Sequence, residues 1–247
     1  MRISHLGIMI QDKPTNHINK KLYLSAKPEG IPGWTEEHYV QQVSRVDLNY
    51  DLNMAYFNSL DFNKFNSYLL QQCKKLKFVE CYNLTNLDNK SGVYMLVLDD
   101  YKQVYIGISN NIKRRIMSHW NKRKSLERLL FGDVCNSILS IDSFGALDTT
   151  RIFYIETFST YETEEKIVNE FFPGYILNRT AGGIGSYETN TENELSAKFS
   201  VLANRKTRNL IKFLNIERLK SIVSESEFKY YLKRYPELLK KQFIPEG

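Results

Sequence analysis

Residues 92–119 read GVYMLVLDDYKQVYIGISNNIKRRIMSH, and the local structure that this stretch predicts decides the fold. The apolar runs GVYMLVL and QVYIGI have the composition of β-strands, and the polar segment DDYK between them predicts a hairpin. A basic run begins near Asn111 and continues to His119 or slightly beyond with the spacing of a helix. Two paired strands followed by a helix therefore form the centre of the expected fold.

The chain continues this pattern after an insertion. Residues 125–131 predict a short helix, and the apolar segments 138–141 and 150–158 are both strand candidates. A further helix is expected to start at Ser159 and to end before Pro173, because proline cannot continue a helix. The order β-β-α, insertion, β-α predicts a mixed α/β (α+β) domain with a small three-stranded antiparallel sheet flanked by helices.

Helical regions are expected on both sides of this central domain. In the first region, Thr35 is expected to cap a short helix to about Val43, and the apolar spacing over 62–76 predicts another helix. The last region predicts two or three basic amphipathic helices. The chain is thereby divided into a helix-rich accessory region, a central domain and a basic helical region, which are residues 1–90, 91–186 and 187–247.

Length and composition restrict the class of protein. With 247 residues, of which 42% are hydrophobic, the chain is long enough to bury a sizeable core. No apolar run reaches the roughly 18 residues of a membrane-spanning helix, and the N-terminal segment lacks the cleavage pattern of a signal peptide. Cys73, Cys81 and Cys135 have no zinc-site spacing and cannot all pair, which favours free thiols. These features predict a cytoplasmic protein that does not bind a membrane.

Basic residues are concentrated in two zones of a chain whose net charge is +6. Residues 111–128 hold 7 Lys and Arg against 1 Asp or Glu, and residues 198–241 hold 12 against 4. Such zones suit a nucleic-acid partner, although solvated helix faces or a helical cap on the core would give the same pattern. The candidate nucleic-acid contacts are Lys113, Arg114, Lys122, Arg123, Arg205, Lys206, Arg208 and Lys212.

Four side chains of the opening stretch match the needs of phosphodiester hydrolysis, and they are Tyr94, Tyr105, Arg115 and His119. Arg115 and His119 are four residues apart, so they share one face of the expected helix. Arginine offers a planar fork to phosphate oxygens, and histidine exchanges protons near neutral pH. A phenol becomes a plausible base when a cation lies nearby. Gly107 ends the second strand, where bare backbone would let a phosphate approach.

A carboxylate for a metal ion has to come from elsewhere in the chain. On the helix expected after residue 159, the core face is predicted to consist of Ile167, Val168 and Phe171. Glu164 precedes these residues by three, four and seven positions, so it lies on the same face and is the preferred ligand. Glu165 and Glu162 remain alternatives. A single carboxylate that is completed by water suits Mg²⁺, which keeps much of its hydration. Seen alone, each of these residues is more often structural, so the prediction depends on their joint occurrence.

The ordered set of motifs resembles the GIY-YIG nuclease superfamily. GVY is followed after ten residues by YIG, and Arg115 comes eight residues after the glycine of that second motif. The helix-borne Glu164 and a later asparagine, Asn178 in ILNRTAGG, complete the pattern. The resemblance covers residues 91–186. Val93 stands where the first motif of the family has isoleucine, which is a conservative change within a strand.

The resemblance implies a role for each residue of the pattern. Tyr94 and Tyr105 would flank the attacking water, one of them as general base, and Arg115 would bind the scissile phosphate. His119 matches a histidine that some members have, and it would assist proton transfer. Glu164 would hold the metal ion, and Asn178 would order the site by hydrogen bonding.

The resemblance also implies an activity. Such a protein is a Mg²⁺- or Mn²⁺-dependent endonuclease that cuts DNA at a single site, with a restriction, mobile-element or DNA-processing role. A single site cuts one strand per event, so double-strand cleavage would need a homodimer or re-binding. A non-catalytic nucleic-acid-binding protein that keeps the fold remains an alternative. The second alternative is a ribonuclease or a structure-specific repair nuclease, with RNA or branched DNA as partner.

Overall fold

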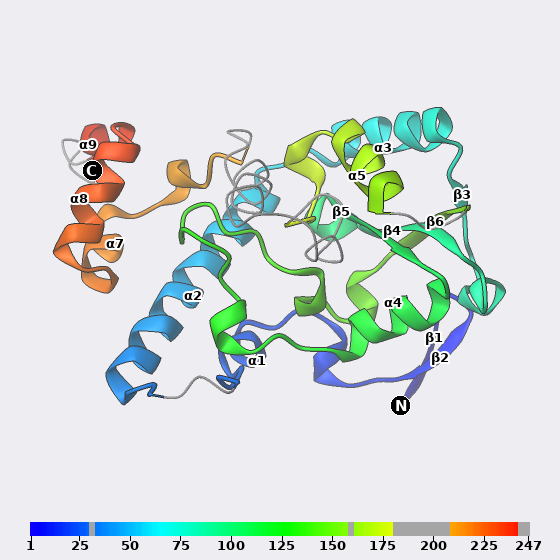
Figure 1. Cartoon of the computed structure of the whole chain (residues 1–247), viewed down its shortest axis with the longest axis horizontal. Helices are drawn as coiled ribbons and strands as arrows, with labels where there is room; N and C mark the ends of the chain where they lie inside the picture. The colour runs from blue at the N-terminus through cyan, green and yellow to red at the C-terminus, as the bar shows by residue number, and fades with distance from the viewer. Residues whose placement is uncertain (30–32, 158–160, 180–207, 242–247) are drawn as a thin grey trace.

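The computed structural model describes residues 1–29, 33–157, 161–179 and 208–241 (Figure 1). The strands are Arg2–His5 (β1), Ile8–Gln11 (β2), Val79–Glu80 (β3), Gly92–Leu98 (β4), Gln103–Ser109 (β5) and Arg151–Glu156 (β6). The α-helices are Lys20–Leu24 (α1), Glu36–Asn58 (α2), Phe62–Leu76 (α3), Ile112–Asn121 (α4), Tyr161–Glu170 (α5), Ile216–Ile222 (α7), Glu225–Arg234 (α8) and Glu237–Lys241 (α9).

The central sheet has four antiparallel strands in the order β3-β6-β4-β5. A mixed helix-and-sheet fold is confirmed, but the expected three-stranded sheet lacks one strand, because β3 pairs with β6 through Val79 and Tyr154. β3 has only two residues, which are too few to show a strand periodicity in the sequence. A separate hairpin of β1 and β2 also lies in the N-terminal region that the sequence predicted as helix-rich.

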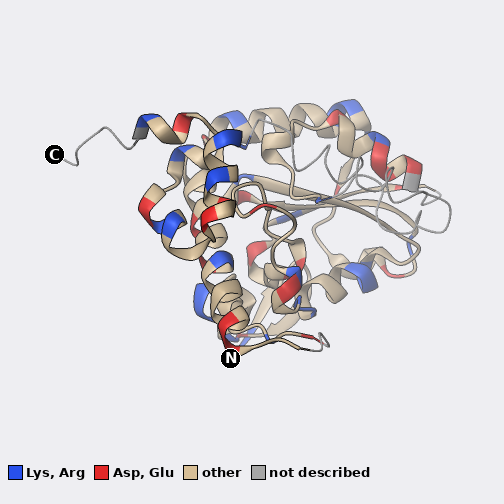
Figure 2. Ribbon diagram, turned by 60° about the vertical axis from the view of Figure 1, so that its left-hand side comes forward, with Lys and Arg blue, Asp and Glu red and all other residues tan. Residues whose placement is uncertain are grey.

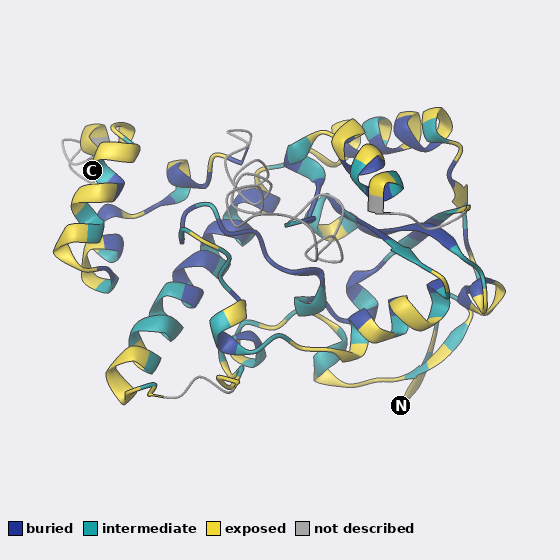
Figure 3. Cartoon of the chain, in the orientation of Figure 1, coloured by how far each residue is buried: buried dark blue, intermediate teal, exposed yellow. Residues whose placement is uncertain are grey.

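Both faces of the sheet are covered, which explains why every residue of β4 is buried. Successive side chains of a strand point to opposite faces. Tyr94 and Leu96 belong to the core cluster that includes residues of α2 and α4, whereas Val93 and Met95 belong to the cluster with α3 and α5. Figure 1 shows α3 and α5 above the sheet and α4 below it, and Figure 3 shows the buried strands between them. The sheet is therefore the middle layer of the fold.

The helices at 62–76 and after Asn111 are confirmed as α3 and α4. Asn111 is the N-cap of α4, and its side-chain oxygen accepts a hydrogen bond from the Arg114 N–H at 2.9 Å. The helix expected before Pro173 is α5, and its proposed start at Ser159 lies outside the described residues. The elements that carry most of the candidate site residues are thus the expected ones.

α2 is much longer than the sequence predicted. Thr35 caps it as expected, but the helix does not end near Val43. Asn49 and Asn53 break its apolar periodicity, and yet both side chains are buried. Both amides donate hydrogen bonds to the Ser137 carbonyl, at 2.8 and 2.9 Å. These asparagines therefore belong to the buried face of α2, where they hold the insertion between α4 and β6.

The strand expected at 138–141 is wrong, and the short helix expected at 125–131 is reduced to one 3₁₀ turn. The insertion consists of irregular chain with the 3₁₀ turns Leu126–Arg128, Ile141–Ser143 and Ala146–Asp148. Side chains, rather than a neighbouring strand, bind its carbonyl groups. Arg179 Nε, for example, donates to the Ile138 carbonyl at 2.7 Å. An apolar segment that is buried without a partner strand has the same sequence signature as a strand.

The flanking regions share a core with the central sheet. Leu52 of α2, Leu96 of β4 and Leu219 of α7 belong to one cluster of buried apolar side chains. The division of the chain into three domains stays a prediction. The three cysteines, Cys73, Cys81 and Cys135, are free and buried, as expected. Within the described ranges, no helix combines the length and the apolar character needed to cross a membrane.

Candidate active site

Tyr94 and Tyr105 lie on neighbouring strands and face the same side of the sheet. The register pairs Tyr94 with Gly107 and Leu96 with Tyr105, so the two phenols are diagonal neighbours across the strand pair. Their ring centroids are 6.3 Å apart. Tyr94 is fully buried, whereas Tyr105 is half-buried. This arrangement follows from the alternation of side chains that the sequence showed.

Gly107 leaves space for the hydroxyl group of Tyr94. A β-carbon at position 107 would lie 2.4 Å from Tyr94 Oη and 2.6 Å from Tyr94 Cζ. The expectation that this bare backbone admits a phosphate is corrected, because the phenol itself lies over it. Gly107 thus determines where the Tyr94 hydroxyl can lie.

Gly107→Ala is expected to lower the free energy of unfolding by about 2 kcal/mol, because overpacking of a close-packed core costs energy of this size. The same methyl group should push the Tyr94 hydroxyl out of place. Denaturant unfolding measures the loss. In a Tyr94→Leu background the shorter side chain removes the clash, so Gly107→Ala should cost almost nothing there. An equal cost in both backgrounds would contradict the assignment.

α4 places a cation beside both phenols. Its buried residues are Ile112, Ile116 and His119, which anchor the helix, and Arg115 is exposed on the same helix. Burial, and then the neighbouring Tyr105, raise the pKa of Tyr94 well above its ordinary value, whereas Arg115 opposes this rise. Burial also raises the pKa of Tyr105, and Arg115 again acts in the opposite direction. Arg115 is therefore the charge that favours a phenolate at this site.

His119 joins Tyr94 to a carboxylate that the sequence reasoning missed. Its Nε2 lies 2.8 Å from Tyr94 Oη, and its Nδ1 lies 2.6 Å from Oδ1 of Asp142. The Tyr105 ring meets the imidazole edge-to-face at 5.1 Å between centroids. Burial lowers the pKa of His119, although Asp142 raises it. Asp142 comes from the irregular insertion, and the one signal in the sequence was an acidic residue within the apolar run ILSIDSF.

Glu164 projects from α5 on the face that the sequence predicted. It is 6% exposed, and Ile167, Val168 and Phe171 of the same helix are also buried. The alternatives differ, because Glu162 is exposed and Glu165 is half-buried. Burial raises the pKa of Glu164 to about 7, and the charge of Arg115 opposes the rise.

The surroundings of Glu164 suit a cation. Within the described part of the chain, no group donates a hydrogen bond to its carboxylate, and no cluster of three or more His, Cys, Asp or Glu side chains could hold a metal ion. A buried carboxylate without donors is unfavourable as an anion unless a cation binds. This environment fits Mg²⁺ or Mn²⁺ held by one protein carboxylate and water.

The stability of the metal-free protein is expected to fall as pH rises and the Glu164 carboxyl loses its proton. Folding favours the protonated form of Glu164, because the pKa is raised from 4.5 to about 7. The stabilisation is complete below pH 4.5 and is lost as pH rises through about 7. At pH 8, Glu164→Gln should therefore be more stable than the wild type by about 3 kcal/mol. Denaturant unfolding at pH 5 and pH 8 in EDTA measures this difference.

Mg²⁺ provides the control for the same experiment. Binding to the native state should raise the stability of the wild type at pH 8 and leave Glu164→Gln unchanged. Equal stability of the wild type and Glu164→Gln at pH 8 without metal would contradict the prediction that the buried Glu164 carboxylate destabilises the fold.

Asn178 binds the outer edge of β5. Its Oδ1 accepts from the Ile106 N–H at 2.9 Å, and its Nδ2 donates to the Ile106 carbonyl at 2.7 Å. Ile176 bridges Val104 in parallel, so the segment that leads to Asn178 follows the strand. The amide thereby replaces a missing strand neighbour between Tyr105 and Gly107. This position agrees with an ordering role by hydrogen bonding.

Seven of the eight predicted nucleic-acid contacts fall into three groups. Arg114, Lys122, Arg123 and Lys212 are exposed. Lys113 forms an ion pair with Asp88 at 2.7 Å. Arg205 and Lys206 lie outside the described residues. Figure 2 shows basic and acidic residues interspersed on the C-terminal helices. The cations of this set that are nearest in sequence to Arg115 are therefore exposed, with Lys113 as the exception.

Arg208 is a correction to this set. It is buried, and its Nη2 donates to Gln103 Oε1 and to the Ile176 carbonyl. Its guanidinium lies 5.3 Å from the ring centroid of Tyr56. The sequence predicted a helix here that would expose Arg208. In the described chain that follows Arg208, Leu210–Phe213 forms only a 3₁₀ turn. Arg208 therefore joins the C-terminal region to the core, where its side chain is buried and is not presented to a polyanion.

Comparison with known proteins gives one match. Residues 90–172 match the model of the family described as "GIY-YIG catalytic domain". The matched segment begins just before β4 and ends just after α5, so it contains both tyrosines, Arg115, His119 and Glu164. No curated protein and no solved structure matches the chain.

These observations define an α+β domain whose sheet and helices bring phenol, guanidinium, imidazole and carboxylate groups to one site. The segment 90–172 belongs to the GIY-YIG nuclease superfamily. The resemblance seen in the sequence is thereby confirmed.

Proposed function

We propose that the chain is a divalent-metal-dependent endonuclease that hydrolyses DNA phosphodiester bonds at a single site. The observation that carries the proposal is the position of the Arg115 cation, which acts on Tyr94, Tyr105 and Glu164 together. Residues on β4, β5, α4 and α5 thus converge although they are far apart in sequence. A purely structural role would not require an exposed cation next to a buried phenol, a half-buried phenol and a buried carboxylate.

The chemistry follows from these groups. The exposed guanidinium of Arg115 is suited to the scissile phosphate, because it offers a planar donor fork that stays charged. Tyr94, hydrogen-bonded to His119 and facing Arg115, is suited to orient a water molecule and to accept its proton. Glu164 would hold Mg²⁺ or Mn²⁺, which when bound would offset the negative charge of the transition state. Asn178 keeps the β5 edge in place.

Several biological roles suit this activity, and they are restriction, mobile-element function and DNA processing. One site cuts one strand per event, so cleavage of both strands would need a homodimer or a second binding event. The exposed residues Arg114, Lys122 and Arg123 would contact backbone phosphates and give salt-dependent affinity.

A plasmid-nicking assay tests the proposal. Supercoiled DNA is incubated with the full chain in Mg²⁺, Mn²⁺ or EDTA, and wild type is compared with Tyr94→Phe, Arg115→Ala and Glu164→Ala. Nicking in either metal that is lost in EDTA and in all three variants would support the proposal. Undiminished nicking in the variants would reject the site.

The same proteins also distinguish the proposed function from two other functions. A non-catalytic binding protein would retain DNA and cleave nothing under any condition. A ribonuclease or a structure-specific nuclease would prefer RNA or branched DNA when linear duplex, branched duplex and RNA compete in one reaction.

A further inference from the structure

Asp142 stands behind His119 on the side away from Tyr94. It belongs to the 3₁₀ turn Ile141–Ser143, and its Oδ1 lies 2.6 Å from His119 Nδ1. Its second oxygen, Oδ2, forms an ion pair with Lys124 at 3.2 Å. The side chains of His119 and Asp142 are 3% and 11% exposed, so water competes little for either bond. Both carboxylate oxygens are therefore held by specific partners.

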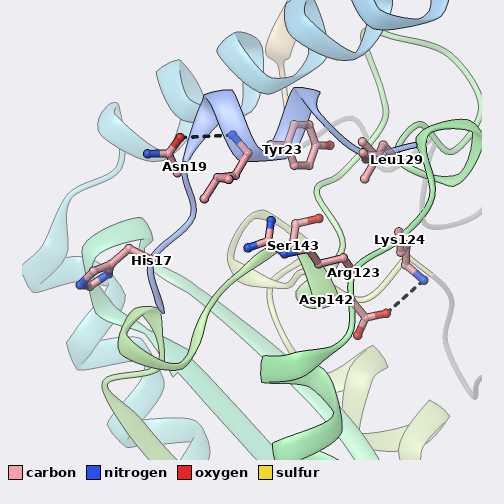
Figure 4. A pocket seen from close by; sticks show the side chains of 10 residues that line it. His17, Asn19, Tyr23, Arg123, Lys124, Leu129, Asp142 and Ser143 are labelled. Atoms are coloured by element: carbon pink, nitrogen blue, oxygen red, sulfur yellow. Dashed lines mark hydrogen bonds and ion pairs between the residues drawn. The ribbon is translucent and has the colours of Figure 1, made fainter. Parts of the chain in front are cut away.

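Lys124 pairs with the second carboxylate oxygen of Asp142 at the wall of a pocket. Figure 4 shows the Asp142–Lys124 ion pair at the edge of a small pocket, whose wall also includes His17, Tyr23 and Ser143. The pocket lies against Asp142 and Lys124 and is not lined by Tyr94 or His119. The carboxylate thus forms part of the wall that separates the imidazole from this pocket.

The charge of Asp142 decides the direction of the hydrogen bonds. Burial alone would raise its pKa, but hydrogen bonding to His119 and the charge of Lys124 lower it to about 2. A carboxylate accepts hydrogen bonds and donates none, so His119 Nδ1 must carry the proton. A neutral imidazole then has a lone pair on Nε2, and the Tyr94 hydroxyl must donate to it at 2.8 Å.

We propose that Asp142 is a positioning residue that fixes the Nδ1–H tautomer of His119, so that Nε2 accepts the phenolic proton of Tyr94. The catalytic purpose of this tautomer rests on the proposed nuclease function, whereas the tautomer itself is independent of that function. Asp142 does not touch the reacting atoms, and Lys124 supports it from the other side. The insertion between α4 and β6, which carries no other assigned role, thereby supplies a part of the site.

The proton transfer is balanced by two fixed charges. The Tyr94 O–H bond breaks, the Nε2–H bond forms, and an ion pair of phenolate and imidazolium results. Arg115 stabilises the phenolate and Asp142 stabilises the imidazolium. The phenolate then takes the proton that the attacking water loses as its oxygen bonds to phosphorus. The leaving oxygen departs with the electron pair of its bond to phosphorus and is protonated by solvent, and the imidazolium returns its proton to solvent.

The groups around the imidazole come from each neighbouring element. Tyr94 of β4 and Tyr105 of β5 meet it on one side, and Asp142 meets it on the other. Burial lowers the pKa of His119 the most, Asp142 raises it, and the charges of Arg115 and Lys124 lower it. The balance leaves a neutral base at neutral pH, which the proposed transfer requires.

Nitrogen-15 NMR of histidine-labelled full-length protein, without metal or DNA, measures the tautomer directly. The His119 signals are those that disappear in His119→Gln. In the wild type we expect protonated Nδ1 and unprotonated Nε2. Asp142→Asn keeps the shape of the side chain and should lose this pattern, either to the Nε2–H form or to a mixture. Ser143→Ala, a change in the same turn at a residue with no bond to His119, should retain it.

The same spectra recorded against pH give a second readout that a merely structural role would not move. The pKa of His119 should fall in Asp142→Asn, because the carboxylate that raises it is gone. It should rise in Lys124→Met, because a cation that lowers it is gone. Opposite shifts in the pKa of His119 in two folded variants support the proposal. If Asp142→Asn does not fold, the wild-type tautomer and the pKa of His119 in Lys124→Met still decide the test.

Cleavage kinetics connect the tautomer to function. Asp142→Asn should lower kcat about 10²-fold and leave KM nearly unchanged, since proton transfer in the transition state contributes at least this much. An Nε2–H tautomer in the wild type, or an unchanged tautomer and kcat in Asp142→Asn, would overturn the proposal. If the wild type cleaves no nucleic acid, the nuclease function fails, whereas the spectra still decide whether Asp142 fixes His119.

Discussion

Glu164→Gln is expected to lower the rate of plasmid nicking by about 10³-fold. Loss of one fixed electrostatic partner of a transition state costs this much in enzymes, and a metal ligand supplies several kcal/mol. Glu164 is the buried glutamate of α5, and burial raises its pKa to about 7. The amide keeps the size of the side chain and removes the charge that would hold the cation.

The adjacent glutamate is a matched control for this change. Glu165 lies on the same helix and is half-buried, and it does not share the core-facing position of Glu164. Glu165→Gln should therefore nick DNA at nearly the wild-type rate. The rates are measured at several Mg²⁺ concentrations, because a weakened metal site would recover at high concentration and an absent one would not. Loss with Glu165→Gln and not with Glu164→Gln would move the metal ligand by one residue.

Folding does not explain the expected loss. Because the buried carboxylate is unfavourable when charged, Glu164→Gln should be at least as stable as the wild type near pH 8. A variant that is more stable and inactive separates a catalytic role from a structural one.

Arg115→Ala is expected to lower kcat for nicking by about 10³-fold with a smaller change in KM. Arginine side chains that stabilise the charge of a transferring phosphoryl group contribute 10³-fold or more. Arg115 is exposed, so it can reach a substrate, and its charge also opposes the rise in the pKa of both tyrosines. The variant thus loses a phosphate contact and the cation that favours the phenolate.

Arg114 provides the comparison, because it is the neighbouring arginine and is also exposed. Arg114→Ala should raise KM and reduce the salt dependence of binding by about one phosphate contact, while kcat stays close to the wild-type value. Single-turnover cleavage at saturating protein, together with binding measured against salt, distinguishes the two arginines. A rise in KM with an unchanged kcat in both variants would mean that α4 acts only as a binding surface.

Much of the site could be predicted because it depends on short-range geometry. Alternation along a strand placed Tyr94 on a single face with Leu96, and the helical repeat placed Arg115 and His119 one turn apart. The same repeat identified Glu164 from the apolar positions that follow it on α5, and the structure buries all of them. These relations hold within one element or one hairpin, so the order of residues along the chain is sufficient to give them.

Contacts between distant segments could not be predicted in this way. Asp142 reaches His119 from an insertion that has no periodicity, and its place is set by side chains such as Asn49 and Arg179 that bind backbone carbonyls of that insertion. Arg208 was expected on an exposed helix, but it is buried against Tyr56. Each of these outcomes depends on which carbonyl or ring happens to lie within reach after folding.

The sequence by itself determined the strand pair, the basic helix and the buried glutamate, because periodic patterns report which side of an element meets the core. The tertiary structure alone decided that the Tyr94 hydroxyl lies over Gly107, that a fourth strand extends the sheet, and that Asp142 binds His119. Those relations join groups that are separated by 13 to 75 residues, and close packing and hydrogen bonding select them only when the whole chain is assembled.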